Sequence, residues 1–184
     1  MLRLYLKGVI MRLKGKRAAV LAENLYEELE LWYPYHRLRE EGAEVLIVGT
    51  GSSDTYNGKH GYPVRINTTA DKVKAGDLDC VVVPGGYAPD YMRRYPALLK
   101  LVRDAFDQGK VIGAICHAGW VLVSSGVLKG RKVTCYSAIK DDIVNAGAEY
   151  INAEVVIDGN LITSRKPDDL PAFMREIIKA LEER

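Results

Sequence analysis

Short apolar runs rich in β-branched residues alternate along the chain with longer segments whose apolar residues recur at helical spacing. The apolar runs predict strands at 18–21, 45–48, 80–83, 111–115, 132–135, 155–157 and 161–164. The longer segments predict helices at 27–41, 91–108, 117–125, 139–146 and 169–182. This alternation is typical of a mostly parallel sheet covered by helices on both faces. The pattern therefore predicts an α/β three-layer sandwich in a single domain, residues 17–184.

Two stretches carry turn residues in place of a helical pattern. Between Gly49 and Thr69 the dipeptides Asn57-Gly58 and His60-Gly61 predict a hairpin or a long excursion beside the sheet. The triplet 158–160, Asp-Gly-Asn, predicts a second hairpin between the last two strands.

Composition narrows the class of protein. The chain has 184 residues, the size of one domain, and its 26 Lys and Arg are scattered among 24 Asp and Glu. A net charge of +2 without a basic block gives no sign of nucleic-acid binding. Three cysteines without paired spacing favour a reducing cytoplasm and predict neither a metal site nor another cofactor.

The two most hydrophobic stretches do not predict a membrane protein. The uncharged run 111–128 contains glycines, serines and a Cys-His pair, which favour a buried strand, a turn and a buried helix over a membrane span. Residues 1–16 are interrupted by Lys7 and Arg12 and lack a small-residue cleavage site. We expect them to form a loose N-terminal leader.

The sharpest chemical signal is Cys116, which follows an apolar strand and precedes His117. Small residues at Ala114, Ala118 and Gly119 are what a nucleophile elbow needs, because strand and helix pack closely around its strained turn. A helix starting at His117 would lower the pKa of the Cys116 thiol through its dipole. The pattern predicts a reactive thiolate rather than an ordinary buried cysteine.

The ends of two other strands, at 80–83 and at 18–21, are expected to face this cysteine, because ligands bind beyond the carboxyl ends of parallel strands. Two residues after the strand at 80–83 are candidates. Gly86, in Pro84-Gly85-Gly86, is a natural second oxyanion donor beside the amide of His117. Asp90 suits a helix cap, which does not exclude another role.

Four acids follow the first strand within eight residues, and one of them could hydrogen-bond the sulfur in its protonated form. Spacing alone does not choose among these acids, which are Glu23, Glu27, Glu28 and Glu30. Histidines occur only at 36, 60 and 117. A class I glutamine amidotransferase takes its catalytic histidine from a late segment, so the absence of any later histidine counts against that class.

Several motifs in order resemble the PfpI family of intracellular cysteine proteases, within the DJ/PfpI superfamily, from about Arg17 to the C-terminus. The motifs are Glu27, Tyr33 to Leu38, Gly58 to Tyr62, Pro84 to Gly86, Ala114 to His117 and Ile139 to Asp142. The resemblance implies a flavodoxin-like fold, of the kind also found in class I glutamine amidotransferases.

The resemblance also implies roles. Cys116 is the nucleophile, His117 its base or orienting partner, and Glu27 the acid that hydrogen-bonds the thiolate. The amides of Gly86 and His117 form the oxyanion hole. The remaining two positions implied by the family are Tyr136, which lines the pocket, and Asp90, which completes a triad from the adjacent subunit.

Two departures from the family pattern affect these roles. Asp90 stands where some members have Glu, which shortens the reach to His117, and Ala118-Gly119 replaces the more usual Gly-Pro. A site shared between subunits implies a homo-oligomer, at least a dimer and by resemblance a hexamer built as a trimer of dimers.

Three functions fit these residues. The leading expectation is a cytoplasmic cysteine peptidase in which the Cys116 thiolate attacks a peptide carbonyl. The first alternative is a glutathione-independent glyoxalase or protein deglycase, in which the thiolate adds to methylglyoxal or acts on its adducts while Glu27 shuttles a proton. The second is a non-enzymatic stress role, as a redox sensor through reversible oxidation of Cys116 or as a chaperone.

Overall fold

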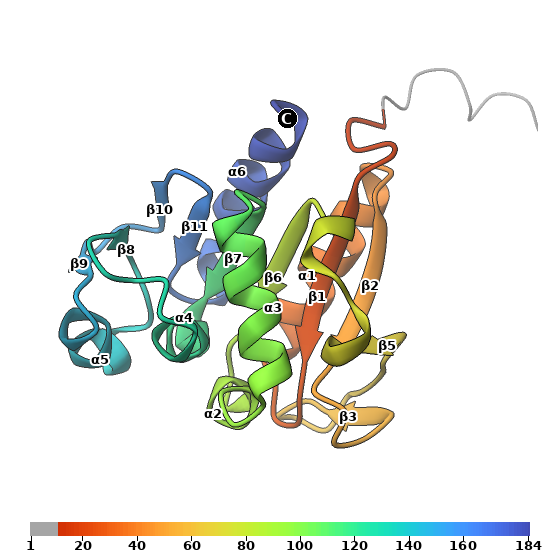
Figure 1. Cartoon of the computed structure of the whole chain (residues 1–184), viewed down its shortest axis with the longest axis horizontal. Helices are drawn as coiled ribbons and strands as arrows, with labels where there is room; N and C mark the ends of the chain where they lie inside the picture. The colour runs from red at the N-terminus through yellow and green to blue at the C-terminus, as the bar shows by residue number, and fades with distance from the viewer. Residues whose placement is uncertain (1–10) are drawn as a thin grey trace, which may run out of the picture.

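A seven-stranded sheet forms the centre of the protein, shown in Figure 1 by a computed structural model that describes residues 11–184. In spatial order its strands are β10 (Val155–Asp158), β11 (Leu161–Ser164), β7 (Val111–Ile115), β6 (Cys80–Val83), β1 (Arg17–Ala22), β2 (Glu44–Gly49) and β5 (Thr68–Thr69). All neighbouring pairs are parallel except β10 with β11. The predicted mostly parallel sheet is confirmed.

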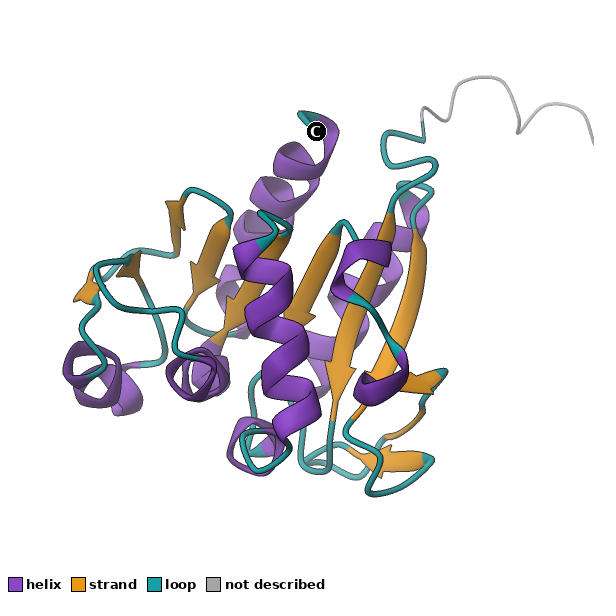
Figure 2. Ribbon diagram, viewed as in Figure 1, coloured by secondary structure: helices purple, strands orange, loops and turns teal. Residues whose placement is uncertain are grey.

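Helices cover both faces of this sheet (Figure 2). Helices α1 (Glu28–Glu40) and α6 (Leu170–Glu182) pack together on one face, against β1, β2, β7 and β11. Helix α3 (Pro96–Asp107) packs on β6 and β7 from the other face, beside α4 (Gly119–Ser125). Strands β1, β6 and β7 are buried because helices cover them on both sides, which explains their continuous apolar runs. The three-layer α/β prediction is confirmed.

The order of the strands indicates where a ligand would bind. The five central parallel strands run β2, β1, β6, β7, β11, which is the flavodoxin-like order 2-1-3-4-5. The chain reverses direction across the sheet between β1 and β6, so the loops that leave these two strands diverge and open a crevice. The carboxyl ends of β1, β6 and β7 meet there.

Two predicted elements differ from the structure. The helix expected at 91–108 is two helices, α2 (Ala88–Met92) and α3, because Pro96 takes the first position of α3 and cannot continue the preceding one. The strand expected at 132–135 shrinks to β8 (Lys132–Val133), which pairs with β9 (Glu149–Tyr150) in a separate ladder. A short helix, α5 (Lys140–Asn145), joins β8 to β9.

Both predicted hairpins are present. Strands β3 (Thr55–Asn57) and β4 (Pro63–Arg65) pair antiparallel beside the sheet, and β10 pairs with β11 across the turn at 158–160. The β3–β4 hairpin brings residues 58–62 over the start of α1, because Tyr26 bridges to Gly58. This placement carries part of the hairpin to the crevice.

The chain before β1 is packed where the structure describes it. Leu13 is fully buried and its N–H donates to the carbonyl of Glu41 at 2.8 Å, while Arg12 forms ion pairs with Glu41 and Glu182. Residues 11–16 of the expected leader therefore belong to the domain, and the first ten lie outside the described residues. Among residues 11–184, no helix is long and apolar enough to cross a membrane.

Candidate active site

Cys116 lies on the sharp turn that the sequence predicts. It follows the last residue of β7, Ile115, and has a backbone φ of 62°, a left-handed value that costs a non-glycine residue of the order of 1–3 kcal/mol. One 3₁₀ turn, Cys116–Ala118, leads into α4. A Cβ at Gly119 would come within 2.7 Å of Ile143 Cδ1, so the glycine allows α4 to pack closely against α5.

Two backbone amides, of Gly86 and His117, are directed at the sulfur, and their hydrogen bonds favour its ionised form. Gly86 has a φ of 76°, and a Cβ on its neighbour Gly85 would lie 2.7 Å from Cβ of Cys116. Only glycines allow this close approach of the β6 loop. The pair of amides expected for an oxyanion hole thus lies around Cys116.

The His117 ring lies beside the nucleophile, with Nδ1 3.2 Å from Sγ of Cys116. Tyr136 stacks on this ring at a centroid distance of 5.0 Å, and Trp120 meets it edge-on at 5.3 Å. Burial, aided by the charge of Lys59, lowers the pKa of His117 below its ordinary value. The imidazole is therefore neutral at neutral pH and free to accept the thiol proton.

Glu30 supplies the acid that lies against the sulfur. Its side chain is fully buried, Oε2 accepts a hydrogen bond from the amide of Gly85 at 2.7 Å, and its carboxyl interacts with the Cys116 thiol. The other oxygen, Oε1, is buried without a well-aligned hydrogen bond to any described residue. Burial, together with the charge of Glu27, raises the pKa of Glu30 to about 8, so it holds a proton at neutral pH.

Glu27 has a different partner from the one expected of it. It precedes α1, is almost fully buried, and forms an ion pair with Lys59 from the β3–β4 hairpin. The contact with the sulfur predicted for Glu27 is made by Glu30, one helical turn later. The reason is geometric: Glu30 points to the core side of α1, whereas Glu27 lies where the helix begins and meets the hairpin.

Burial and two backbone amides act on the pKa of the Cys116 thiol in opposite directions. Burial, followed by the charge of Glu30, raises the pKa of Cys116 to about 12, and the amides of Gly86 and His117 lower it. The lowering expected from a helix starting at His117 is outweighed, because α4 starts only at Gly119 and has seven residues. Since the Glu30 carboxyl and the Cys116 thiol contact each other, the two groups titrate as a pair.

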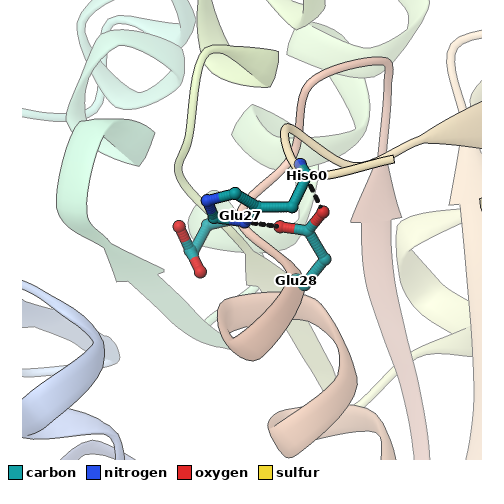
Figure 3. Close-up of side chains that lie close together, drawn as sticks. All are labelled: Glu27, Glu28 and His60. Atoms are coloured by element: carbon teal, nitrogen blue, oxygen red, sulfur yellow. Dashed lines mark hydrogen bonds and ion pairs between the residues drawn. The ribbon is translucent and has the colours of Figure 1, made fainter. Parts of the chain in front are cut away.

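Glu27, Glu28 and His60 offer a carboxylate oxygen or ring nitrogen within 4.8 Å of one another. Figure 3 shows the Glu27 carboxylate turned away from the other two, which bond to each other. The Glu27 carboxylate is instead paired with the ammonium of Lys59. These contacts engage the ligand atoms a metal would need, and we assign no metal here.

The family follows from comparison with known proteins. The DJ-1/PfpI family model matches residues 16–180, which is most of the chain. This chain belongs to the DJ-1/PfpI family. The match confirms the resemblance read from the motifs, and it covers the elbow, the amides of Gly86 and His117, and the acids at the start of α1.

Individual relatives agree with the family assignment. Deglycase PH1704 of Pyrococcus horikoshii is 49% identical over 162 residues, covering 88% of this chain and 97% of that protein. YraA of Bacillus subtilis, which carries a provisional cysteine-protease name, is 37% identical over 91% of this chain and 99% of its own. Among solved structures, Drosophila melanogaster DJ-1beta superposes with a TM-score of 0.83 at 32% identity, covering 92% of this chain and 91% of that one.

Of the other two positions implied by the family, Tyr136 lines the pocket of Cys116 and Asp90 does not. Tyr136 is 40% exposed, lines the pocket of Cys116, and its N–H donates to the carbonyl of Cys116 at 3.2 Å. Asp90 lies in α2, forms an ion pair with Arg94, and borders a neighbouring hollow with Tyr87 and Trp120. Within one chain, Asp90 does not line the pocket of Cys116.

The pocket around the sulfur has a volume of about 360 Å³. Its side chains that bear on the chemistry are Glu27, Glu30, Lys59, Cys116, His117 and Tyr136. Sequence reasoning left Glu30 as one of four acids and did not single out Lys59. In the structure, Glu30 shares the buried side of α1 with Pro34 and Leu38, which follow it at a spacing of four.

Proposed function

We propose that the protein is a cysteine-dependent deglycase that removes methylglyoxal from the amino and guanidino groups it modifies. The observation that carries the proposal is the buried carboxyl of Glu30, which holds a proton at neutral pH against a nucleophilic cysteine. Isomerising the three-carbon fragment needs a group that both gives and takes protons near pH 7, and a carboxyl with a pKa of about 8 is suited to that task. The name of Deglycase PH1704 supports the same activity, and other curated relatives carry the deglycase name.

The first step exchanges nitrogen for sulfur. Methylglyoxal bound to an amine is a carbinolamine, R–NH–CH(OH)–CO–CH₃. The Cys116 sulfur bonds to the carbinol carbon as its proton passes to the neutral imidazole of His117, the C–N bond breaks, and the amine leaves with the proton of Glu30. The product of this step is a hemithioacetal on Cys116, with the amine restored.

The second step moves hydrogen within the bound fragment. Glu30, ionised by giving its proton to the amine, takes the proton from the carbinol carbon and returns it to the adjacent carbonyl carbon, while the hydroxyl proton moves to the carbonyl oxygen. This converts the hemithioacetal to a lactoyl thioester. The amides of Gly86 and His117 stabilise negative charge on the fragment's oxygen. Water then hydrolyses the thioester to lactate and regenerates the thiol, so no external oxidant or reductant is needed.

The test is an assay of amine recovery and lactate from N-acetylarginine and N-acetyllysine pre-treated with methylglyoxal. We expect both products, at rates faster than the adducts release methylglyoxal spontaneously, and neither product with Cys116→Ser. Lactate that forms no faster than spontaneous release would show that the enzyme acts on free methylglyoxal, as a glyoxalase. No lactate from adduct or free aldehyde would refute the proposal.

Peptide hydrolysis is the second candidate, supported by the name of YraA and by the two amides around the sulfur. The described pocket offers no carboxylate to orient His117, since Glu27 is paired with Lys59 and Asp90 lies outside it. A pocket of about 360 Å³ also suits a small adduct better than an extended peptide. Casein hydrolysis measured beside lactate production decides which activity is the larger.

We also propose that the enzyme works in the cytoplasm as a homo-oligomer, in which Asp90 of one chain approaches His117 of another. The Asp90 side chain is 45% exposed in the single chain, beside the exposed Tyr87, and is therefore available to a second copy. Asp90→Ala should lower casein turnover while leaving the alkylation of Cys116 unchanged. A fully active monomer in size-exclusion chromatography would reduce Asp90 to its ion pair with Arg94.

A further inference from the structure

The segment 58–62, which we call the 58–62 loop, has no part in the reaction as derived. It folds back on itself, because Gly58 N–H donates to the carbonyl of Tyr62 and Gly61 N–H to that of Gly58, each at 2.9 Å. It is also tied to the chain before α1. Lys59 N–H donates to the carbonyl of Tyr26 at 2.9 Å, and the Tyr26 hydroxyl donates to the carbonyl of Tyr62 at 2.6 Å.

The Glu28 side chain also holds the 58–62 loop, through two contacts with His60. Its Oε1 accepts the N–H of His60 at 2.7 Å, and its Oε2 lies 3.0 Å from Nδ1 of the same residue (Figure 3). A Cβ at Gly58 would collide with the Glu28 carboxyl, so the loop passes as close as a glycine allows. Lys59 is therefore held from both sides, with its ammonium paired to Glu27 at the wall of the pocket.

The charges around Cys116 come from three directions. Glu27 and Glu30 face it from the start of α1, Lys59 from the hairpin, and His117 from its own turn. The imidazole is neutral at neutral pH, which leaves Lys59 as the cation among the described side chains of the pocket. The charge of the Cys116 sulfur acts on Lys59 in turn, raising its pKa after the larger effect of Glu27.

We propose that Lys59 is a positioning residue for the reaction: its ammonium, fixed by the 58–62 loop, balances the Glu27 carboxylate so that negative charge can reside on the Cys116 sulfur. Without Lys59, the sulfur would ionise next to an uncompensated carboxylate in a buried pocket. The effect on turnover rests on the proposed function, but the effect on the thiol does not.

The experiment measures the rate of Cys116 alkylation by iodoacetamide against pH in Lys59→Met. We expect alkylation about tenfold slower at pH 7 and a profile moved to higher pH, since one unit of thiol pKa changes the thiolate fraction about tenfold. Lys59→Arg keeps the charge and should restore most of the rate. Lys72→Met, which removes an exposed lysine outside the pocket, is the matched control.

A second pair of variants keeps the test decisive if Lys59→Met folds poorly. Glu27→Gln removes the opposing charge and should move the alkylation profile to lower pH. The double variant Glu27→Gln/Lys59→Met restores the balance and should return the profile toward that of the parent protein. Glu28→Ala, which releases the loop, should move the profile in the direction of Lys59→Met by a smaller amount.

Several results would overturn the inference. One is a folded Lys59→Met variant whose alkylation rate depends on pH as in the parent protein. The others are equally slow alkylation in Lys59→Arg and Lys59→Met, and an alkylation profile of Glu27→Gln that moves to higher pH. Lactate production is measured on the same samples. If the parent protein makes no lactate, the proposed function fails, while the alkylation profiles still decide the role of Lys59.

Discussion

Glu27 and Glu30 stand one helical turn apart at the start of α1, and both are buried at the wall of the same pocket. Glu27 meets a cation, Lys59, whereas Glu30 meets a backbone amide and the thiol of Cys116. An ion pair keeps a buried carboxylate charged, whereas burial without a cation makes a carboxyl hold its proton. Two identical side chains thus have different surroundings, and the proposed function gives the proton transfer to Glu30.

The largest effect should come from Glu30→Gln. The amide keeps the size of the side chain but cannot exchange a proton, and positioned acid–base groups typically contribute 10²- to 10⁴-fold. We expect lactate production from methylglyoxal adducts to fall by roughly 10²-fold or more, as measured by steady-state kinetics. Glu27→Gln is the matched control and should lose less than about tenfold. Equal losses in the two variants would mean that the two acids do not differ in role.

The two variants should also differ in the sign of their effect on stability. The pKa of Glu30 is about 8 in the fold against an ordinary 4.5, so between these values only the unfolded chain releases the proton. Stability contributed by Glu30 is therefore complete below pH 4.5, falls as pH rises, and is lost above about 8. Glu30→Gln removes this loss and should gain on the order of 2 kcal/mol at pH 7.

Glu27→Gln should instead lose roughly 1 kcal/mol, because it leaves Lys59, which is about a third exposed, without its partner. Urea denaturation at pH 5 and pH 7 measures both changes. The gain in Glu30→Gln should shrink at pH 5, and the loss in Glu27→Gln should not. A Glu30→Gln variant that is less stable at pH 7 would mean that Glu30 is ionised in the fold.

The smallest effect concerns the coupling between the two acids. The charge of Glu27 contributes to the raised pKa of Glu30, so neutralising Glu27 should lower that pKa by less than one unit. The alkaline limb of the turnover profile, where Glu30 loses its resting proton, should move to lower pH in Glu27→Gln. An alkaline limb that stays in place would show that the two carboxyls do not interact.

The sequence predicted the scaffold and the nucleophile better than the acids. The buried parallel strands are recognisable as short apolar runs, and the small residues around Cys116 are what the tight turn of a nucleophile elbow needs. The choice among the acids depends on where α1 begins and how it is rotated. That is set by the irregular turn before it, where Leu25 takes a φ of 63°, and local sequence does not encode this turn.

The sequence did not predict Lys59 as a residue of the pocket for a related reason. Its place in the pocket depends on a hairpin that crosses the sheet edge and on Glu28 binding His60, more than thirty residues away in the chain. The split of residues 91–108 at Pro96 had a signal in the sequence, since proline takes the first position of a helix but cannot continue one.

The protonation state of Glu30 is the central claim, and infrared difference spectroscopy measures it directly. The parent protein should show the carbonyl stretch of a protonated carboxyl at pH 7, disappearing with a midpoint near pH 8. The band should be absent from Glu30→Gln and present in Glu27→Gln. A parent protein without this band at pH 7, or a band removed by Glu27→Gln and kept in Glu30→Gln, would contradict the account.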